Sequence, residues 1–282
     1  MIGQEHLFEI WETMIQDDTV PRFSIIAGDR GSGKKTFVKF IQKRLQEEQG
    51  IAHYILGDIK IDDVRDMIEA SHKLKKICFC IYNADAMSLP AKNAMLKVIE
   101  ECPNDNYFIM TLEDVHNTLS TIRSRARVYD MEPYTSVQIE EFAGSIVGHS
   151  DDIDIIKSVC ETPGDAQLLI KTGARDFYYY VEKVVDNIAG VSLSNSFKIG
   201  SKVGIDGDED KYDLKLFWKM FSKVCMDRAM SLIGDIDTTE TLINYSIGVK
   251  ITSKALSQLR TKGINKQMLF DKWLLDIREE WK

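Results

Sequence analysis

The stretch Arg22-Phe-Ser-Ile-Ile-Ala-Gly-Asp-Arg-Gly-Ser-Gly-Lys-Lys-Thr36 decides the fold of this chain, because it joins a short apolar run to a glycine-rich turn. The apolar residues before Gly28 predict a short buried strand. Apolar residues at helical spacing predict a helix from about residue 34 to residue 48. A strand, a glycine-rich turn and a helix in this order are typical of a loop that binds phosphate.

This candidate loop matches the spacing GxxxxGK at Gly28, Gly33 and Lys34. Glycines let backbone amides approach a phosphate, the helix N-terminus adds positive potential, and Lys34 is expected to reach the terminal oxygens. The next position calls for a magnesium-binding hydroxyl but holds Lys35, and Thr36 follows one residue late. Each helical residue turns the side chain by about 100°, so Thr36 points elsewhere. The predicted cofactor-binding residues are Gly28, Gly31, Gly33, Lys34, Lys35 and Thr36.

The second element of a magnesium site is altered as well. An aspartate that holds the metal and a glutamate that activates water are expected after the strand predicted at residues 77–81. Tyr82 and Asn83 stand there instead, and neither is anionic. Asp85 lies beyond the strand and is interpreted as a turn residue. Lys35, Tyr82 and Asn83 are three departures in one site, and together they indicate that ATP hydrolysis is lost. Two roles then stay open for the glycine-rich loop: a structural turn, or weak nucleotide binding without magnesium.

Strands and helices alternate through the first half of the chain. Further strands are predicted at residues 52–56, 77–82, 107–112 and 127–131, and helices at residues 6–16, 61–73 and 89–101. Such alternation predicts a parallel sheet covered on both faces, which is an α/β domain at residues 1–133.

The pattern becomes helical after Pro133. Three short helices predict a lid domain at residues 134–174, and a longer helical stretch with a polar loop at residues 192–210 predicts a separate domain at residues 175–282. The helices are predicted near residues 136–147, 152–160, 166–172, 176–188, 212–233, 239–259 and 265–281.

Composition excludes several classes of protein. A chain of 282 residues with 44% hydrophobic and 28% charged residues is typical of a globular protein with two or three domains. A net charge of -8 argues against a free-standing nucleic-acid-binding protein. The five cysteines form no CxxC pair, which predicts reduced thiols and no zinc site. With no apolar run of about 20 residues and no signal sequence, we expect a cytoplasmic protein without membrane contact.

Six motifs over roughly residues 1–172 resemble the clamp-loader branch of the AAA+ ATPases. They are Ile2-Gly-Gln, the phosphate loop, Asn83-Ala-Asp-Ala-Met, Asn93-Ala-Met-Leu-Lys-Val-Ile-Glu-Glu-Cys-Pro, Thr121-Ile-Arg-Ser-Arg-Ala and Pro163-Gly-Asp-Ala-Gln. The fourth and fifth motifs together are the most specific, with Cys102 and Ala126 as small departures. The resemblance implies a P-loop AAA+ sheet domain, a small helical lid and an all-helical collar that joins five subunits in a ring.

The resemblance also implies a site that acts on another subunit. In this family a Ser-Arg pair directs its arginine toward ATP held by a neighbour, which assigns Ser124 and Arg125 to catalysis in trans. A guanidinium in that place stabilises charge on the transferring phosphoryl group. Gln167 replaces the lid arginine that holds the γ-phosphate, while Thr111 occupies another nucleotide-sensing region. The implied partners are the other clamp-loader subunits of a hetero-pentamer, the sliding clamp and primed DNA.

Three interpretations stay open. The first is a clamp-loader subunit that does not hydrolyse ATP itself, binds ATP or ADP weakly or not at all, and donates Arg125 to a neighbour. The second is an active motor subunit, and the altered magnesium residues and Gln167 argue against it. The third is a P-loop kinase or unrelated NTPase, which does not explain the Glu100-Glu101 and Ser124-Arg125 motifs.

Overall fold

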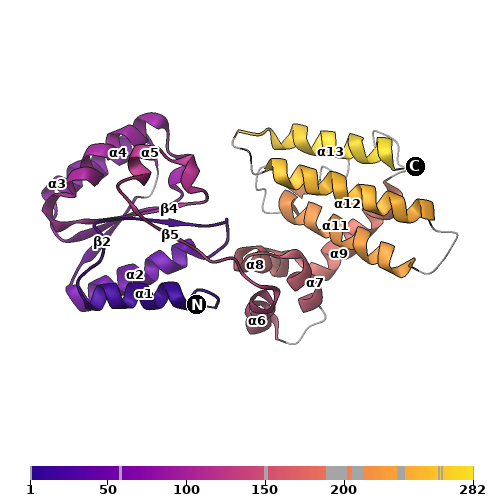
Figure 1. The fold of residues 1–282 in the computed structure, drawn as a ribbon, viewed down its shortest axis with the longest axis horizontal. Coiled ribbons are helices and arrows are strands. Elements are labelled where there is room, and N and C mark those ends of the chain that lie inside the picture. The colour runs from indigo at the N-terminus through magenta and orange to yellow at the C-terminus, as the bar shows by residue number, and fades with distance from the viewer. Residues whose placement is uncertain are drawn as a thin grey trace. The chain divides into compact units, whose positions relative to one another are not determined.

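The computed structural model describes residues 2–56, 59–148, 152–188, 202–204, 212–233, 239–259, 261 and 263–281. The chain forms two compact units (Figure 1). The first consists of Met1–Gln138 and Thr162–Gly164, and the second of Ile139–Glu161 and Asp165–Lys282.

A five-stranded parallel sheet lies at the centre of the first unit. Its strands are β1 (Phe23–Ala27), β2 (Ala52–Leu56), β3 (Ile77–Ile81), β4 (Tyr107–Leu112) and β5 (Arg127–Asp130). Their spatial order is β2-β3-β4-β1-β5. The predicted parallel sheet is confirmed. The strands predicted at residues 77–82 and 127–131 each end one residue early, at Ile81 and Asp130.

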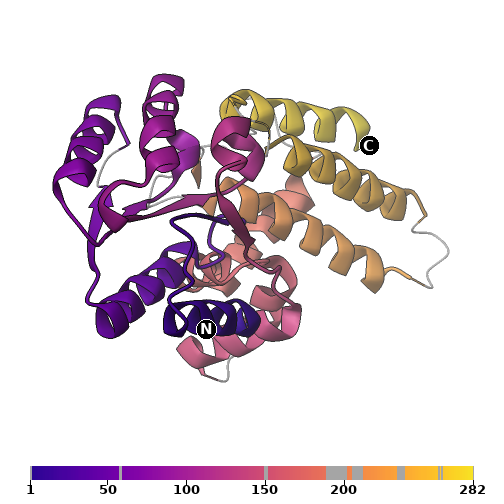
Figure 2. The ribbon, with the colours of Figure 1, turned by 60° about the vertical axis from the view of Figure 1, so that its left-hand side comes forward.

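Helices cover both faces of this sheet (Figures 1 and 2). They are α1 (Glu5–Gln16), α2 (Lys34–Gln49), α3 (Ile61–Lys73), α4 (Leu89–Glu101) and the short α5 (Ser120–Arg123). Successive strand residues point to opposite faces. Cys78 and Cys80 of β3 therefore pack with the residues of α1 and α2. Phe79 and Ile81 pack with those of α3 and α4. Burial on both faces explains why the inner strands β1, β3 and β4 are nearly continuous apolar runs, whereas the edge strands β2 and β5 have exposed residues.

Two local signals set the limits of α4, the helix that carries the glutamate pair. Ser88 is its N-cap, and the Ser88 side chain accepts a hydrogen bond from the Ala91 amide at 3.4 Å. Pro90 occupies the first turn, where no intrahelical donor is needed. At the other end Cys102 adopts a left-handed conformation with φ of 39°, which turns the chain out of the helix. Glu100 and Glu101 are consequently presented on the last helical turn.

The second unit is mainly helical. Its helices are α6 (Ser136–Val147), α7 (Asp152–Val159), α8 (Pro163–Thr172), α9 (Ala174–Asn187), α11 (Leu214–Ser231), α12 (Thr239–Leu259) and α13 (Lys266–Glu280), the first residues of α6 and α8 belonging to the first unit. No helix among the described residues is both long and apolar enough to cross a membrane. The predicted division between a lid and a collar after residue 174 stays a prediction.

Several predicted helices begin at other residues in the structure. The helix predicted from residue 166 begins at Pro163, and the one predicted from residue 176 begins at Ala174. The helix predicted from Tyr212 begins at Leu214, because Asp213 caps it by accepting a hydrogen bond from the Leu216 amide at 3.1 Å. Tyr212 instead belongs to β7 (Tyr212–Asp213), which pairs in parallel with β6 (Val203–Gly204). Only residues 202–204 of the polar loop predicted at residues 192–210 lie inside the described part of the chain.

The core of the first unit offers a direct test of this arrangement. Phe79 is fully buried and stacks on Phe108 with ring centres 5.2 Å apart. We expect Phe79→Ala to lower the free energy of unfolding of this unit by about 3–5 kcal/mol, since it leaves a cavity that packed neighbours do not fill. Hydrogen exchange of the β1 and β4 amides reports this unit alone. Ile55→Ala on the neighbouring strand is the matched control because Ile55 is 46% exposed, and equal losses in both variants would contradict the assigned core.

Candidate functional site

The direction of the parallel strands separates the candidate residues into two groups. In a parallel sheet all carboxyl ends lie at one edge and all amino ends at the opposite edge, and α/β proteins bind ligands beyond the carboxyl ends. The phosphate loop follows β1 and therefore lies beside the residues that follow β3 and β4. Arg125 precedes β5, so it lies at the amino edge, near the start of β1.

The phosphate loop has the backbone that its glycines predict. Gly31 and Gly33 have φ of 83° and 93°, a region that glycine enters without steric cost. Lys34 begins α2 and is only 8% exposed. Its ammonium donates hydrogen bonds to the carbonyl oxygens of Gly28 at 2.6 Å and Asp29 at 2.9 Å. Burial lowers the pKa of Lys34. Lys34, which was expected to reach a phosphate, thus stabilises the loop itself through these two hydrogen bonds.

The segment Thr162–Gly164 packs directly on this loop, within the first unit. The Gly164 amide donates to the Gly31 carbonyl at 3.0 Å, and the Thr162 hydroxyl donates to the Arg30 carbonyl at 3.3 Å. A Cβ atom on Gly164 would lie 2.5 Å from the Gly31 Cα atom, too close for any side chain. The loop conformation therefore depends on glycine at both positions.

Two of the altered magnesium positions contact each other at the carboxyl edge. The Lys35 ammonium lies 5.6 Å from the centre of the Tyr82 ring, a cation–π contact. Burial raises the pKa of Tyr82 to about 12, so the phenol is neutral at physiological pH. Thr36, the displaced threonine, is exposed on α2. Because Mg²⁺ prefers carboxylate, phosphate and water oxygens, an ammonium held over a neutral phenol does not fit the metal site of an ATPase.

The other polar residues at this edge hold the backbone. The Asn83 amide donates to the Thr111 hydroxyl at 2.9 Å, and Asn83 has a left-handed φ of 54°. The Asp85 carboxylate accepts hydrogen bonds from the amides of Glu113 at 2.7 Å and Asp114 at 3.4 Å. The interpretation of Asp85 as a turn residue is consistent with these contacts. Across the described ranges, no group of three or more His, Cys, Asp or Glu side chains is placed to hold a metal ion.

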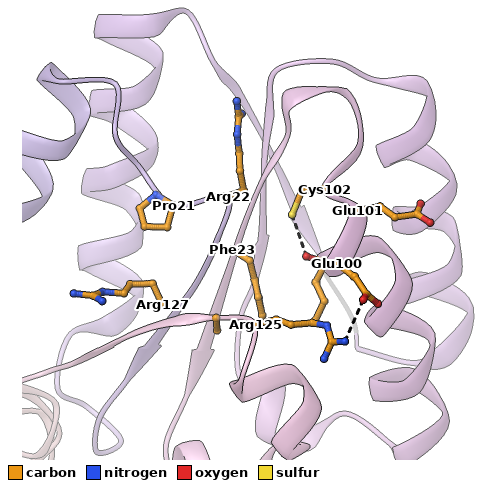
Figure 3. A pocket seen from close by; sticks show the side chains of 10 residues that line it. Pro21, Arg22, Phe23, Glu100, Glu101, Cys102, Arg125 and Arg127 are labelled. Atoms are coloured by element: carbon orange, nitrogen blue, oxygen red, sulfur yellow. Dashed lines mark hydrogen bonds and ion pairs between the residues drawn. The ribbon is translucent and has the colours of Figure 1, made fainter.

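Arg125 is held at the amino edge by two acceptors from different elements. Its Nη1 donates to the Thr121 carbonyl at 3.0 Å, and its Nη2 donates to Glu100 Oε1 at 3.1 Å (Figure 3). The ion pair joins the end of α4 to the turn before β5. The Arg125 side chain is 36% exposed, so part of the guanidinium faces solvent. This hydrogen bond therefore joins the glutamate motif to the Ser-Arg motif, although Glu100 and Arg125 are 25 residues apart in sequence.

An open pocket of about 560 Å³ lies beside this pair. Its lining includes the amino ends of β1 and β5 and the end of α4. Figure 3 shows that Arg22 and Arg127 direct their guanidinium groups away from Arg125. Arg22 is engaged elsewhere, since it pairs with Asp105 at 3.2 Å and lies 4.6 Å from the centre of the Tyr107 ring. Arg125 is thus the pocket arginine that lies next to a glutamate of the α4 pair.

The remaining predicted residues have separate places. The Ser124 hydroxyl donates to the Thr121 carbonyl at 3.1 Å, so it ends the α5 turn, and its assignment to catalysis stays a prediction. Arg123 Nη1 lies 2.8 Å from His116 Nδ1. Gln167 is exposed on α8 in the second unit. The sequence reasoning missed Glu100 as the partner of Arg125, although the two charged motifs were both recognised.

Parts of this chain are similar to known subunits of DNA polymerase III. A family model described as "DNA polymerase III, delta subunit" matches residues 49–135. The chain is 25% identical over 250 residues to DNA polymerase III subunit tau of Bacillus subtilis, a match that covers 70% of this chain and 44% of that protein. It is 24% identical over 191 residues to DNA polymerase III subunit gamma of Buchnera aphidicola (subsp. Schizaphis graminum), covering 57% of this chain and 53% of that protein. The chain thus spans about half the length of these relatives.

Solved structures share the fold at low identity. A gamma subunit-related protein of DNA polymerase III from Thermotoga maritima has a TM-score of 0.50 and 16% identity, covering 97% of this chain and 99% of that one. The RuvB Holliday junction branch migration motor from the same organism has a TM-score of 0.51 and 17% identity, covering 76% and 87%. The chain therefore has an α/β AAA+ fold. The family model and the named relatives are subunits of DNA polymerase III, to which this chain is similar over part of its length.

The contact between the phosphate loop and Gly164 can be tested by a single methyl group. We expect Gly164→Ala to push Thr162–Gly164 off the loop, because the added Cβ would lie 2.5 Å from a backbone atom. The amides of residues 28–33 should then exchange hydrogen faster. Gly144→Ala is the matched control, since a Cβ at Gly144 of α6 meets nothing within 4 Å and alanine favours a helix by up to about 1 kcal/mol. Unchanged exchange in Gly164→Ala would show that the packing does not shape the loop.

Proposed function

We propose that this chain is a DNA replication clamp-loader subunit of the DNA polymerase III delta-prime type, which does not hydrolyse ATP itself. It works in the cytoplasm as one member of a hetero-pentamer and helps to load the sliding clamp onto primed DNA. Within that assembly, Arg125 acts in trans on ATP bound by a neighbouring subunit. The observation that carries the proposal is the Lys35 ammonium over the Tyr82 ring, where an ATPase needs a hydroxyl and a carboxylate for magnesium.

The proposed loss of ATP hydrolysis follows from the charges of the residues that stand at the magnesium site. Magnesium-dependent phosphoryl transfer needs a metal that neutralises the developing charge and a group that orients the attacking water. Lys35 supplies a positive charge instead of a ligand, and Tyr82 and Asn83 supply no anion. The Asp85 carboxylate is held by the backbone amides of Glu113 and Asp114 in the loop after β4.

The trans role of Arg125 rests on its position. The carboxyl edge of the sheet carries the chain's own phosphate loop, while Arg125 lies at the amino edge. Because Arg125 lies at the opposite end of the strands, it cannot contact a phosphate bound by this chain's own loop. Its side chain is partly exposed, so it can contact a neighbouring molecule. In a ring, such an arrangement places the loop of one subunit opposite the arginine of the next.

An active motor subunit is the second candidate. The loop keeps the GxxxxGK spacing with Lys34, and the named relatives are gamma and tau subunits. This function requires that Lys35 and Tyr82 move apart to admit a metal ion. It predicts nucleotide turnover by the purified chain, which makes the two candidates easy to separate.

The first test of the proposal is ATP hydrolysis by the purified chain in magnesium. We expect no turnover above background, because Tyr82 and Asn83 stand at the positions after β3 where an ATPase holds its metal ligand and its base. Lys34→Ala and Lys39→Ala should therefore be indistinguishable from the unaltered chain; Lys39 is an exposed lysine on the same helix and serves as the control. Turnover that Lys34→Ala abolishes and Lys39→Ala leaves intact would establish the motor subunit instead.

The second test uses the complex reconstituted with gamma or tau and the other clamp-loader subunits of the same organism. Arg125→Ala should lower the ATP hydrolysis rate of the complex while assembly, measured by gel filtration, stays intact. A trans arginine in GTPases contributes about 10³ to 10⁵ in rate, which is an upper guide here. Arg123→Ala is the control, since Arg123 contacts His116 and not the pocket. Full activity of an assembled Arg125→Ala complex would refute the trans role.

A further inference from the structure

The two glutamates at the end of α4 have different partners. Glu100 Oε1 accepts a hydrogen bond from Arg125 Nη2 at 3.1 Å, whereas Glu101 pairs with Lys97 of its own helix at 3.9 Å. Neighbouring residues of a helix point about 100° apart, so both carboxylates cannot reach the same group. Figure 3 shows Glu100 directed toward Arg125 and Glu101 directed away from it. The two residues therefore form a natural pair of test and control positions.

The contacts of Arg125 fix its guanidinium at two points. Nη1 is anchored on a backbone carbonyl of α5 and Nη2 on the Glu100 carboxylate. An arginine has five N–H donors in a rigid plane, so two anchors set the orientation of the whole group. The remaining donors make no hydrogen bond to any described residue, and the side chain is 36% exposed. The guanidinium is thus both oriented and accessible.

We propose that Glu100 is a positioning residue for Arg125, an inference that rests on the proposed trans role of Arg125. The carboxylate holds the guanidinium in one orientation before the neighbouring subunit arrives, so that less side-chain freedom is lost when it meets a phosphate. Because both partners are partly exposed, the ion pair is weak and screened by water. A phosphate with more negative charge can then replace the carboxylate. Glu100 thus sets the orientation of the Arg125 guanidinium but still lets the guanidinium leave the ion pair.

This role predicts a specific kinetic signature in the reconstituted complex. Glu100→Gln removes the charge at nearly constant shape and should lower kcat for ATP hydrolysis by about two- to fivefold, the range expected for a weak surface pair. KM for ATP should stay within about twofold, since Glu100 does not touch the nucleotide. Glu100→Asp keeps the charge and should restore part of the loss. Glu101→Gln should behave like the unaltered complex.

A second measurement uses the chain alone and does not depend on any partner. Phenylglyoxal modifies accessible guanidinium groups, and mass spectrometry of peptides gives the rate at Arg125. We expect the rate to rise at least twofold in Glu100→Gln and to stay constant in Glu101→Gln. Arg123, which contacts His116, should react equally in all variants and reports whether the fold is intact.

The outcomes separate this inference from the proposed function. If Arg125→Ala lowers the activity of the complex but Glu100→Gln matches Glu101→Gln in both kcat and modification rate, the positioning role is overturned and the trans role stands. If Arg125→Ala leaves activity unchanged, the trans role fails, and with it the catalytic meaning of Glu100. A higher kcat in Glu100→Gln would also overturn the inference, since the carboxylate would then compete with phosphate more than it orients the arginine.

Discussion

The common direction of the sheet strands is the constraint on which the rest of the first unit depends. Because β1, β3 and β4 are parallel, the residues that follow them meet at one edge, and this brings Lys35, Tyr82 and Asp85 together. The same direction puts the residues that precede β1 and β5 at the other edge, where Arg125 meets Glu100. The fold thus separates two groups of residues, the glycine-rich loop at the carboxyl edge and the partly exposed Arg125–Glu100 pair at the amino edge.

The altered residues of the carboxyl edge form a consistent group. A lysine in place of a hydroxyl would repel a divalent cation, and a tyrosine in place of a carboxylate would fail to attract it, but together Lys35 and Tyr82 make a favourable contact. Lys34 is likewise satisfied by carbonyl oxygens of the loop. The loop is therefore held by contacts within the first unit, including the close approach of Gly31 and Gly164.

Strong periodicity decided which parts of the fold were predictable. The strand at residues 107–112 and the helix at residues 89–101 have the predicted bounds, because a nearly continuous apolar run defines the first and clear caps define the second. The paired strands β6 and β7 were missed, since two residues are too short to show any period. In the site, GxxxxGK spacing located the loop, whereas the direction of the Lys34 side chain depended on burial that no local pattern reveals.

The sequence by itself determined the alternation of strands and helices, the place of the glycine-rich loop and the lack of a carboxylate at the two positions directly after β3, because each is a matter of residue type and spacing along the chain. Only the tertiary structure decided which residues meet. The contact of Lys35 with Tyr82 and the ion pair of Arg125 with Glu100 join segments brought together by strand order. Strand order arises from packing of the whole sheet, which local spacing does not encode.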